Sequence, residues 1–257
     1  MKTDLVPSSG AQGVDAEMQA YFYGLADHLK TRLRGEEVYL ASFYAEDSDF
    51  ARFNRALVRQ AGHVTQRSLN VDLILGEKST AGAVTLSGDS TADRARLDAL
   101  VDELRGRLPH LPDDPHLLYS REVRSTEAHG SSKLPDAPAT LASVLDAARG
   151  LEFVGLWASG GMYSGFANSL GQRNWFSSYT FNLDWSVYHS ADKAVKSSYA
   201  GFEWSDAEFT RKLEQCRDQL GILGREPKTI PPGRYRVYLA PVALGEIVDM
   251  LSWGGWG

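Results

Sequence analysis

The sequence predicts an α+β protein in which antiparallel β-meanders and the helices packed on them occupy separate stretches of the chain. Residues 36–86 alternate apolar and polar side chains with the two-residue period of strands, and residues 151–205 are dense in aromatic and β-branched residues; turn residues interrupt both stretches. Other stretches place apolar residues at three- and four-residue steps, as amphipathic helices do. Hydrophobic residues make up 43% of the 257 positions, which is enough for a packed core.

The first predicted element is a helix from Asp15 to Leu33, which Gly35 ends. Residues 1–14 are expected to be a flexible N-terminus. Four strands are then predicted between Glu36 and Leu86, in the segments VYLASFYAED, FARFNRALVRQ, HVTQRSLNVDLILG and STAGAVTLSG. The glycine and lysine of LGEKST belong to a turn between strands, because the phosphate-loop pattern GxxxxGK[ST] is absent.

The middle of the chain is predicted to be helical, then extended. A helix from Thr91 to Leu108 has Asp89 and Ser90 as candidate N-caps. Residues 109–138 contain five prolines and little periodicity, which predicts an extended connection across the surface. A short helix from Ala139 to Arg149 follows.

The second β-rich block is predicted to form strands in LEFVGLWASG, GMYSGFANS, QRNWFSSYTFNLDWSVYH and KAVKSSYAGFEWS. Tight turns are expected at Gly160-Gly161 and from Asn168 to Gly171. Ser164 is predicted to be a hairpin residue, because GMYSG does not meet the nucleophile pattern G-x-S-x-G. The aromatic residues from Trp175 to Tyr188 can line a peptide groove or fill a core, and their spacing favours the core.

The C-terminal part is predicted to begin with a helix from Asp206 to Leu223. Pro231 to Gly233 mark the best candidate domain boundary, followed by a strand in RYRVYLAP and a helix from Val242 to Leu251. A strand and a helix alone bury little surface. We therefore expect an α+β domain over 15–230 and the beginning of an incomplete, β-rich C-terminal domain over 231–257.

Composition narrows the classes of function. The net charge of −6 gives no basic footprint for nucleic acid or anionic lipid. No apolar run approaches the ~18 residues of a membrane span, and the polar N-terminus lacks a secretory signal, so a cytoplasmic location is expected. The single cysteine, Cys216, cannot form an internal disulfide and is predicted to have a packing or solvent-side role. The six histidines have no metal-ligand spacing.

The order of these features resembles the TldD/PmbA (TldE) family of metallopeptidase-type proteins. The segments that carry the resemblance are FARFNRALVRQ, HVTQRSLNVDLIL, FANSLGQRNW and PPGRYRVYLAPVAL, of which the FANSLG turn and PPGRYRVYLAP are the specific ones. The similarity in order and spacing runs from about Glu36 to Leu251. It covers only the front half of a usual family member.

The resemblance implies a mixed α/β N-terminal domain, a β-rich C-terminal domain, and two subunits around an internal space where peptide is cut. In catalytic members a helix carries HExxxH, whose histidines hold zinc and whose glutamate polarises the bound water. The corresponding stretch here is GEIVDM, with Gly245 and Met250 at the histidine positions and Glu246 at the glutamate position. Neither Gly245 nor Met250 supplies an imidazole, and Glu246 is expected to be a solvated helix carboxylate.

The leading hypothesis is therefore a non-catalytic, PmbA/TldE-like subunit of a TldD/TldE-type zinc metalloprotease complex that cleaves peptides or unfolded proteins. It predicts no catalytic, cofactor-binding or metal-binding residue in this chain and zinc in a catalytic partner. The expected partners are a TldD-like subunit or a second copy, and a peptide substrate. Two alternatives stay open: a stand-alone peptide-binding module that uses exposed strand edges, and a TldD-like metallopeptidase whose motif lies beyond the truncation.

Overall fold

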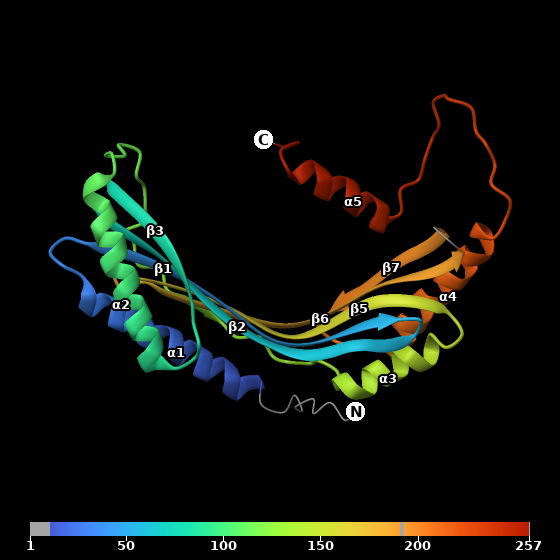
Figure 1. Ribbon diagram of the computed structural model, residues 1–257, viewed down its shortest axis with the longest axis horizontal. Coiled ribbons are helices and arrows are strands. Elements are labelled where there is room, and N and C mark those ends of the chain that lie inside the picture. Colours follow the sequence, from blue (N-terminus) through green and yellow to red (C-terminus); the bar gives the residue numbers. More distant parts are fainter. Residues whose placement is uncertain (1–10, 191–192, 257) are drawn as a thin grey trace. The chain divides into compact units, whose positions relative to one another are not determined.

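The computed structural model describes residues 11–190 and 193–256 and has the α+β fold that the sequence predicts (Figure 1). A seven-stranded sheet is accompanied by helices within these residues. In chain order the elements are α1 (Ala11–Arg32), β1 (Val38–Asn54), β2 (Leu57–Leu75), β3 (Lys78–Thr85), α2 (Ser90–Arg107), the 3₁₀-helix η1 (Leu108–His110), β4 (Thr126–Ala128), α3 (Ala137–Ala147), β5 (Glu152–Asn168), β6 (Arg173–Ser190), β7 (Lys193–Gly201), α4 (Asp206–Leu223) and α5 (Pro241–Ser252).

The strands follow the order β3-β2-β1-β5-β6-β4, and β7 also pairs with β6. Hairpin partners run antiparallel: β2 pairs with β3 from Ser68↔Thr85 to Leu75↔Lys78, and β6 pairs with β7. The short strand β4 instead runs parallel to β6. The sequence did not predict β4, because three exposed residues are too few to reveal a two-residue period.

The chain divides into two compact units, neither of which is a continuous segment. Unit 1 contains residues up to 49, 62–136 and 159–180, and unit 2 contains residues 50–61, 137–158 and 181 onward. The long strands β1, β2, β5 and β6 each contribute to both units. The domain division at residues 230 and 231 stays a prediction.

The first β block divides into strands differently from the prediction: VYLASFYAED and FARFN belong to β1, and LVRQ joins HVTQRSLNVDLIL in β2. The acidic residues Glu46 to Asp49 lie inside β1 rather than at a break, and the hairpin turn falls at Arg55 and Ala56. Likewise Gly160-Gly161 and Ser164 lie inside β5 rather than in a turn. Gly160 is required there for close approach, since a Cβ at this position would lie 2.3 Å from the carbonyl oxygen of Asp47.

The predicted helices are present, with small shifts at their ends. Asp89 caps α2, where its carboxylate accepts hydrogen bonds from the N–H groups of Thr91 and Ala92. Residues 11–14 belong to α1 and not to a flexible segment, whereas residues 1–10 lie outside the described part of the chain. The strand expected in RYRVYLAP is absent, and residues 226–240 are exposed and irregular. None of the described strands pairs with this segment, and an unpaired extended segment would leave its backbone groups without hydrogen-bond partners in the protein.

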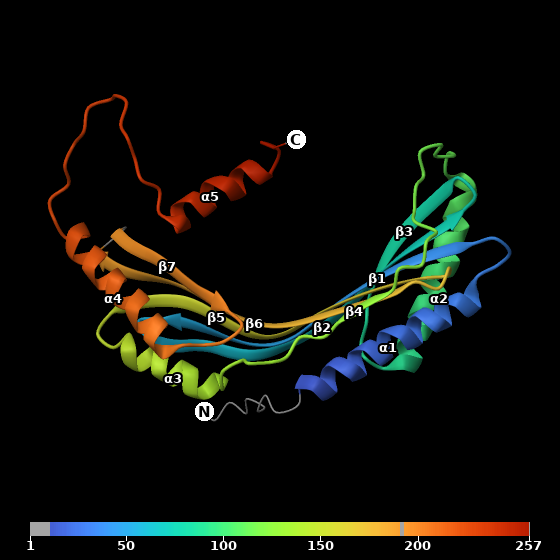
Figure 2. The same ribbon diagram turned by 180° about the vertical axis from the view of Figure 1, so that it is seen from behind.

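Unit 1 is held by an aromatic stack between α1 and the sheet. The ring of Phe22 on α1 lies 5.1 Å from that of Phe43 and 6.3 Å from that of Trp175. Gly165 makes this contact possible, because a Cβ on Gly165 would lie 2.5 Å from the Phe22 ring. Helices α1 and α2 cover one face of this part of the sheet, as both views show (Figures 1 and 2).

Unit 2 has its own core beneath α3 and α4, centred on Trp157, Trp185, Phe153 and Phe209. Cys216 is part of this core, and burial raises the pKa of its thiol. Of the packing and solvent-side roles expected for Cys216, the structure shows the packing role. No helix among the described residues is long and apolar enough to cross a membrane.

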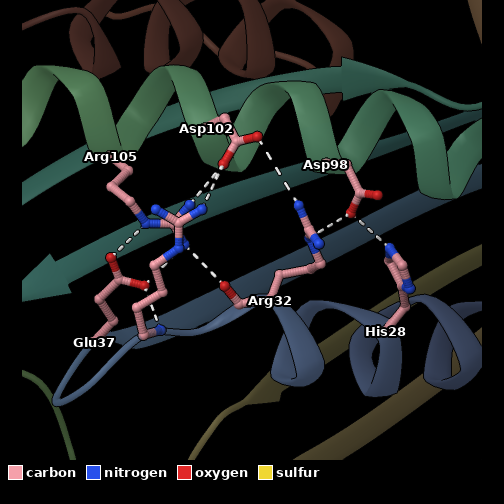
Figure 3. A network of polar contacts seen from close by, with 7 residues as sticks. His28, Arg32, Glu37, Asp98, Asp102 and Arg105 are labelled. Carbon is pink, nitrogen blue, oxygen red and sulfur yellow. Dashed lines mark hydrogen bonds and ion pairs between the residues drawn. The ribbon is translucent and has the colours of Figure 1, made fainter.

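A polar network joins α1 to α2 (Figure 3). Arg105 donates to both carboxylate oxygens of Glu37, at 2.7 and 2.9 Å, and to the carbonyl oxygen of Arg32 at 2.9 Å. The Glu37 side chain is only 4% exposed, and its hydrogen bonds to Arg105 hold its pKa below the ordinary value. Asp98 takes part at the other end by binding His28 Nε2 at 2.7 Å.

We predict that Glu37→Gln lowers the free energy of unfolding by roughly 3 kcal/mol at pH 7, because it leaves a largely buried guanidinium without its main partner. The loss should shrink as the pH falls below about 4.5, since the contribution of a carboxylate with a lowered pKa is full above its unfolded pKa and disappears as the pH falls through its folded pKa. Urea unfolding at several pH values measures it. Glu103→Gln, which breaks the exposed pair with Arg107, should cost less than about 0.5 kcal/mol.

Candidate functional site

The aromatic side chains of β6, which runs through both units, are partly buried and partly exposed. The aromatic residues of β6 separate onto two faces because successive side chains of a strand point in opposite directions. Trp175, Tyr179, Phe181 and Trp185 are buried, as core packing predicts. Phe176 and Tyr188 are 53% and 39% exposed, which core packing does not predict.

Phe176 is aligned with Tyr44 across three neighbouring strands. At the turn between β5 and β6, the N–H of Asn168 donates to the carbonyl oxygen of Gln172. Further along the two strands, Gly161 lies close to Tyr179 and Gly165 lies close to Trp175, which is the same register. In this register Ser164 lies opposite Phe176. On the other side of β5, the bond from Ser169 to Tyr39 sets a register in which Tyr44 lies opposite Ser164.

We call Tyr44, Ser164 and Phe176 the aromatic row. Tyr44 and Phe176 are each 53% exposed, and Met162, on the same face of β5, is 45% exposed. Ser164 is thus neither a nucleophile on an elbow nor a hairpin residue, but a small residue between two exposed rings. Exposed apolar side chains gathered on one face are typical of an interaction surface.

Behind the aromatic row, on the opposite face of the sheet, the buried carboxylate of Asp15 joins three elements. It accepts hydrogen bonds from Trp175 Nε1 at 2.8 Å and from Ser177 Oγ at 2.9 Å, and it binds His129 Nδ1 at 2.8 Å. The hydrogen bond to Asp15 raises the pKa of His129. Sequence reasoning missed this group, because residues 15, 129 and 177 are far apart in the chain.

We call Asp15, His129, Trp175 and Ser177 the Asp15 cluster. It contains an aspartate, a histidine and a serine, but their hydrogen bonds do not run from serine to histidine to aspartate as in a hydrolase triad. Ser177 Oγ donates to Asp15 and accepts from the N–H of Gly130 at 3.0 Å, whereas a nucleophile would donate to the histidine. The cluster therefore fastens α1 and the segment after β4 to β6. Gly130 lies so close to β6 that an added Cβ would be 2.8 Å from the Ser177 carbonyl oxygen.

A second histidine, His63 on β2, is held between two carboxylates of β1. Its Nδ1 lies 2.9 Å from Asp49 Oδ1, and its Nε2 lies 3.0 Å from Asp47 Oδ1. The hydrogen bond to Asp49 is the main reason that the pKa of His63 is raised. Both ring nitrogens are occupied by these contacts. Among residues 11–190 and 193–256, no three His, Cys, Asp or Glu side chains are arranged to hold a metal ion.

The GEIVDM segment lies on α5, whose residues are all exposed. Glu246 accepts a hydrogen bond from Lys196 Nζ at 2.6 Å, and both side chains are more than half exposed. This ion pair holds the pKa of Glu246 below its ordinary value. A shallow pocket of about 370 Å³ lies between α5 and β7, and its lining includes Asp184, Gly245, Glu246 and Asp249. No histidine lines this pocket.

No protein-family model matches the sequence, and no curated protein matches it. Solved structures do match the fold. One is TldE from Thermococcus kodakarensis, which is 10% identical with a TM-score of 0.56; the match covers 78% of this chain and 47% of that one. Another is a candidate modulator of a DNA gyrase from Thermotoga maritima, which is 12% identical with a TM-score of 0.56; the match covers 84% of this chain and 50% of that one. A third is a candidate modulator of DNA gyrase from Bacteroides thetaiotaomicron, which is 11% identical with a TM-score of 0.54; the match covers 80% of this chain and 50% of that one.

These similarities show that the chain has the fold of TldE and of the two candidate gyrase modulators. The chain spans about half the length of each of these proteins. Because the sequence identity is only 10–12%, the comparison shows the fold alone. The shared fold agrees with the TldD/PmbA resemblance of the sequence.

We predict that NMR titration gives His129 a pKa above 6.5 and that Asp15→Asn lowers it, because the buried carboxylate favours the imidazolium form. A raised histidine pKa stabilises the fold below about pH 6.5, and this contribution is lost as the pH rises through the raised value. Asp114→Asn, a change to an exposed carboxylate in the connection, should leave the titration unchanged. An unshifted His129 in the unaltered protein would contradict the interaction.

Proposed function

We propose that this chain is a non-catalytic, TldE-like member of the TldD/PmbA family that acts as a subunit of a cytoplasmic zinc metalloprotease complex. The observation that carries the proposal is the fold shared with TldE from Thermococcus kodakarensis. The glycine and methionine at positions 245 and 250, where the resemblance places zinc-binding histidines, support a subunit that leaves the chemistry to a partner.

In the proposed complex the chain supplies scaffold and part of the wall that contacts a peptide. The aromatic row suits this role because Tyr44 and Phe176 offer large apolar areas at little conformational cost, and the strands beneath them are fixed by the stack on Phe22. Peptides or unfolded proteins, which expose apolar side chains without a fixed shape, are the substrates that such a surface fits.

The experiment compares the full chain alone, a catalytic HExxxH-containing family member alone, and the two together. We expect about one zinc ion per pair, association of the two chains, and more peptide cleavage by the pair than by the catalytic member. Two results would overturn the proposal: neither association nor a change in cleavage, or stoichiometric zinc with chelator-sensitive hydrolysis in this chain by itself.

We further predict that Tyr44→Ser with Phe176→Ser raises the KM of the pair for an apolar peptide about tenfold, the equivalent of ~1.4 kcal/mol of lost ring contacts. Urea unfolding should be nearly unchanged because both rings are surface residues. Leu118→Ser, at a 93% exposed position of the connection, is the matched control and should leave KM unchanged. An unaltered KM in the double variant would remove the aromatic row from the substrate path.

One observation favours a second candidate function, a peptide-binding module that acts by strand addition. Strand β2 pairs with β3 only over Ser68–Leu75, so the described pairing leaves its residues 57–67 without a strand on that side. An extended peptide can add to such an edge through backbone hydrogen bonds. Replacing Thr65 by proline should abolish peptide binding in this case: its N–H points to the same side as the Arg67 carbonyl that accepts from Leu86, and proline cannot donate to an added strand. It should leave the aromatic row unaffected.

A further inference from the structure

The side chain of His63 on β2 bridges two carboxylates of β1, and all three residues belong to unit 1. Asp47 and Asp49 are two residues apart on their strand, so their side chains point to the same face of the sheet. Nε2 of His63 lies 3.0 Å from Asp47 Oδ1, and Nδ1 lies 2.9 Å from Asp49 Oδ1. The neighbouring strand therefore holds the ring at both of its nitrogens.

This geometry fits one protonation state of the ring. A neutral imidazole has one N–H group and one lone pair, whereas an ionised carboxylate can only accept. Both contacts of His63 are hydrogen bonds only when the ring carries both protons. The hydroxyl of Thr65 donates its one hydrogen to Asp47 at 2.8 Å, so its contact with Nε2 at 3.1 Å also requires an N–H on the ring. In the neutral ring, one lone pair would face an oxygen at hydrogen-bond distance.

The arginines and the glutamate near His63 do not change their charge near neutral pH. Arg59 and Arg67 point to the same face of β2, each four residues from His63, and arginine stays protonated at any pH at which the protein folds. Arg59 is exposed, and Arg67 Nε donates to Met18 Sδ at 3.2 Å. Glu46 precedes Asp47 on β1 and so points to the other face of the sheet.

Two phenols on the neighbouring strands also interact with Asp47. They are Tyr163 on β5 and Tyr179 on β6, which contact each other ring to edge. Burial raises the pKa of both phenols, so they carry no charge near neutral pH. The change of charge in this cluster near neutral pH is therefore that of His63.

The bridge lies where β2 has a neighbouring strand on one side only. The pairing of β2 with β3 begins at Ser68, so residues 62–66 pair only with β1 in the described sheet. We call residues 62–66 the free edge of β2. Segments with few neighbours open more readily than segments flanked on both sides. The side-chain bridge from His63 to β1 therefore acts where backbone pairing contributes least.

We propose that His63 is a pH-dependent latch that holds the free edge of β2 on β1. As an imidazolium it joins Asp47 to Asp49 and keeps the free edge closed. After it loses one proton it releases one of the two carboxylates, and the free edge opens more often. The latch lies within unit 1 and does not depend on the proposed protease complex.

The sign of the pH dependence follows from the partners of the ring. The hydrogen bond to Asp49, with the charge of Asp47 adding to it, raises the pKa of His63 above 6.5. A group whose pKa is raised by folding stabilises fully below its unfolded pKa, and the contribution is lost as the pH rises through the raised value. The free edge is therefore closed in mildly acidic solution and loosened in mildly basic solution.

The test is amide hydrogen exchange of the full chain, measured by NMR at about pH 5.5 and about pH 8.5 and expressed as protection relative to unfolded peptides. The Arg67 carbonyl accepts from Leu86 on the β3 side, so the N–H groups of Val64 and Gln66 point to β1. We expect their protection to fall about fivefold as the pH rises, the effect of two partly exposed ion pairs. Asn70, where β2 has a strand on both sides, should change less than about twofold.

Three variants assign the effect. His63→Gln removes the titrating group and should abolish the pH dependence at Val64 and Gln66. His116→Gln changes an exposed histidine of the connection, and as the matched control it should keep the pH dependence. Asp49→Asn retains the imidazole but removes its main charged partner, so it should lower the pKa of His63 and move the fall in protection to lower pH. It provides the second test if His63→Gln fails to fold.

Any of three outcomes would contradict the latch. The first is protection of Val64 and Gln66 that is the same at both pH values. The second is a pH dependence that survives in His63→Gln, or that does not move in Asp49→Asn. The third is an equal fall in protection at Asn70, which would assign the effect to the stability of the whole of unit 1 and not to the free edge of β2.

Discussion

The stack of Phe22 on Phe43 and Trp175 is the interaction on which the rest of unit 1 depends. It covers one face of the sheet with α1, and it requires Gly165 because any larger side chain there would displace the Phe22 ring. Since side chains alternate along a strand, covering Phe43 and Trp175 leaves their neighbours Tyr44 and Phe176 on the other face. The exposed aromatic row is thus a direct consequence of how α1 packs.

The sequence predicts the elements whose pattern is local. The helices, the proline-rich connection and the turn at Asn168 to Gly171 follow from periodicity and turn residues, and the structure confirms them. The errors arise where packing overrides composition. Gly160-Gly161 look like a turn, yet they lie inside β5 because a neighbouring strand approaches closely, and Arg55-Ala56 form a turn without any typical turn residue.

The candidate site was predictable only in part. The aromatic pattern of β6 indicated that some of its rings pack in a core, but the exposure of Phe176 depends on which face the helices cover, and that is a tertiary property. The Asp15 cluster joins residues separated by more than a hundred positions, so no local spacing could reveal it. The α+β class was accessible from sequence, and the fold shared with TldE agrees with it.

The polar groups of unit 1 differ in kind from its exposed aromatic row. The buried carboxylates of Asp15 and Asp93 each accept several hydrogen bonds, Asp93 from Tyr21 Oη at 2.6 Å and from the N–H groups of Ser87 and Gly88 at 2.9 Å. For Asp93, the hydrogen bonds from Tyr21, Ser87 and Gly88 outweigh its burial and hold its pKa below the ordinary value, because they stabilise the charged form. These groups therefore fix α1 and α2 on the sheet. The aromatic row lies on the other face of the sheet, where Tyr44 and Phe176 leave apolar contact area exposed, separate from these buried polar groups.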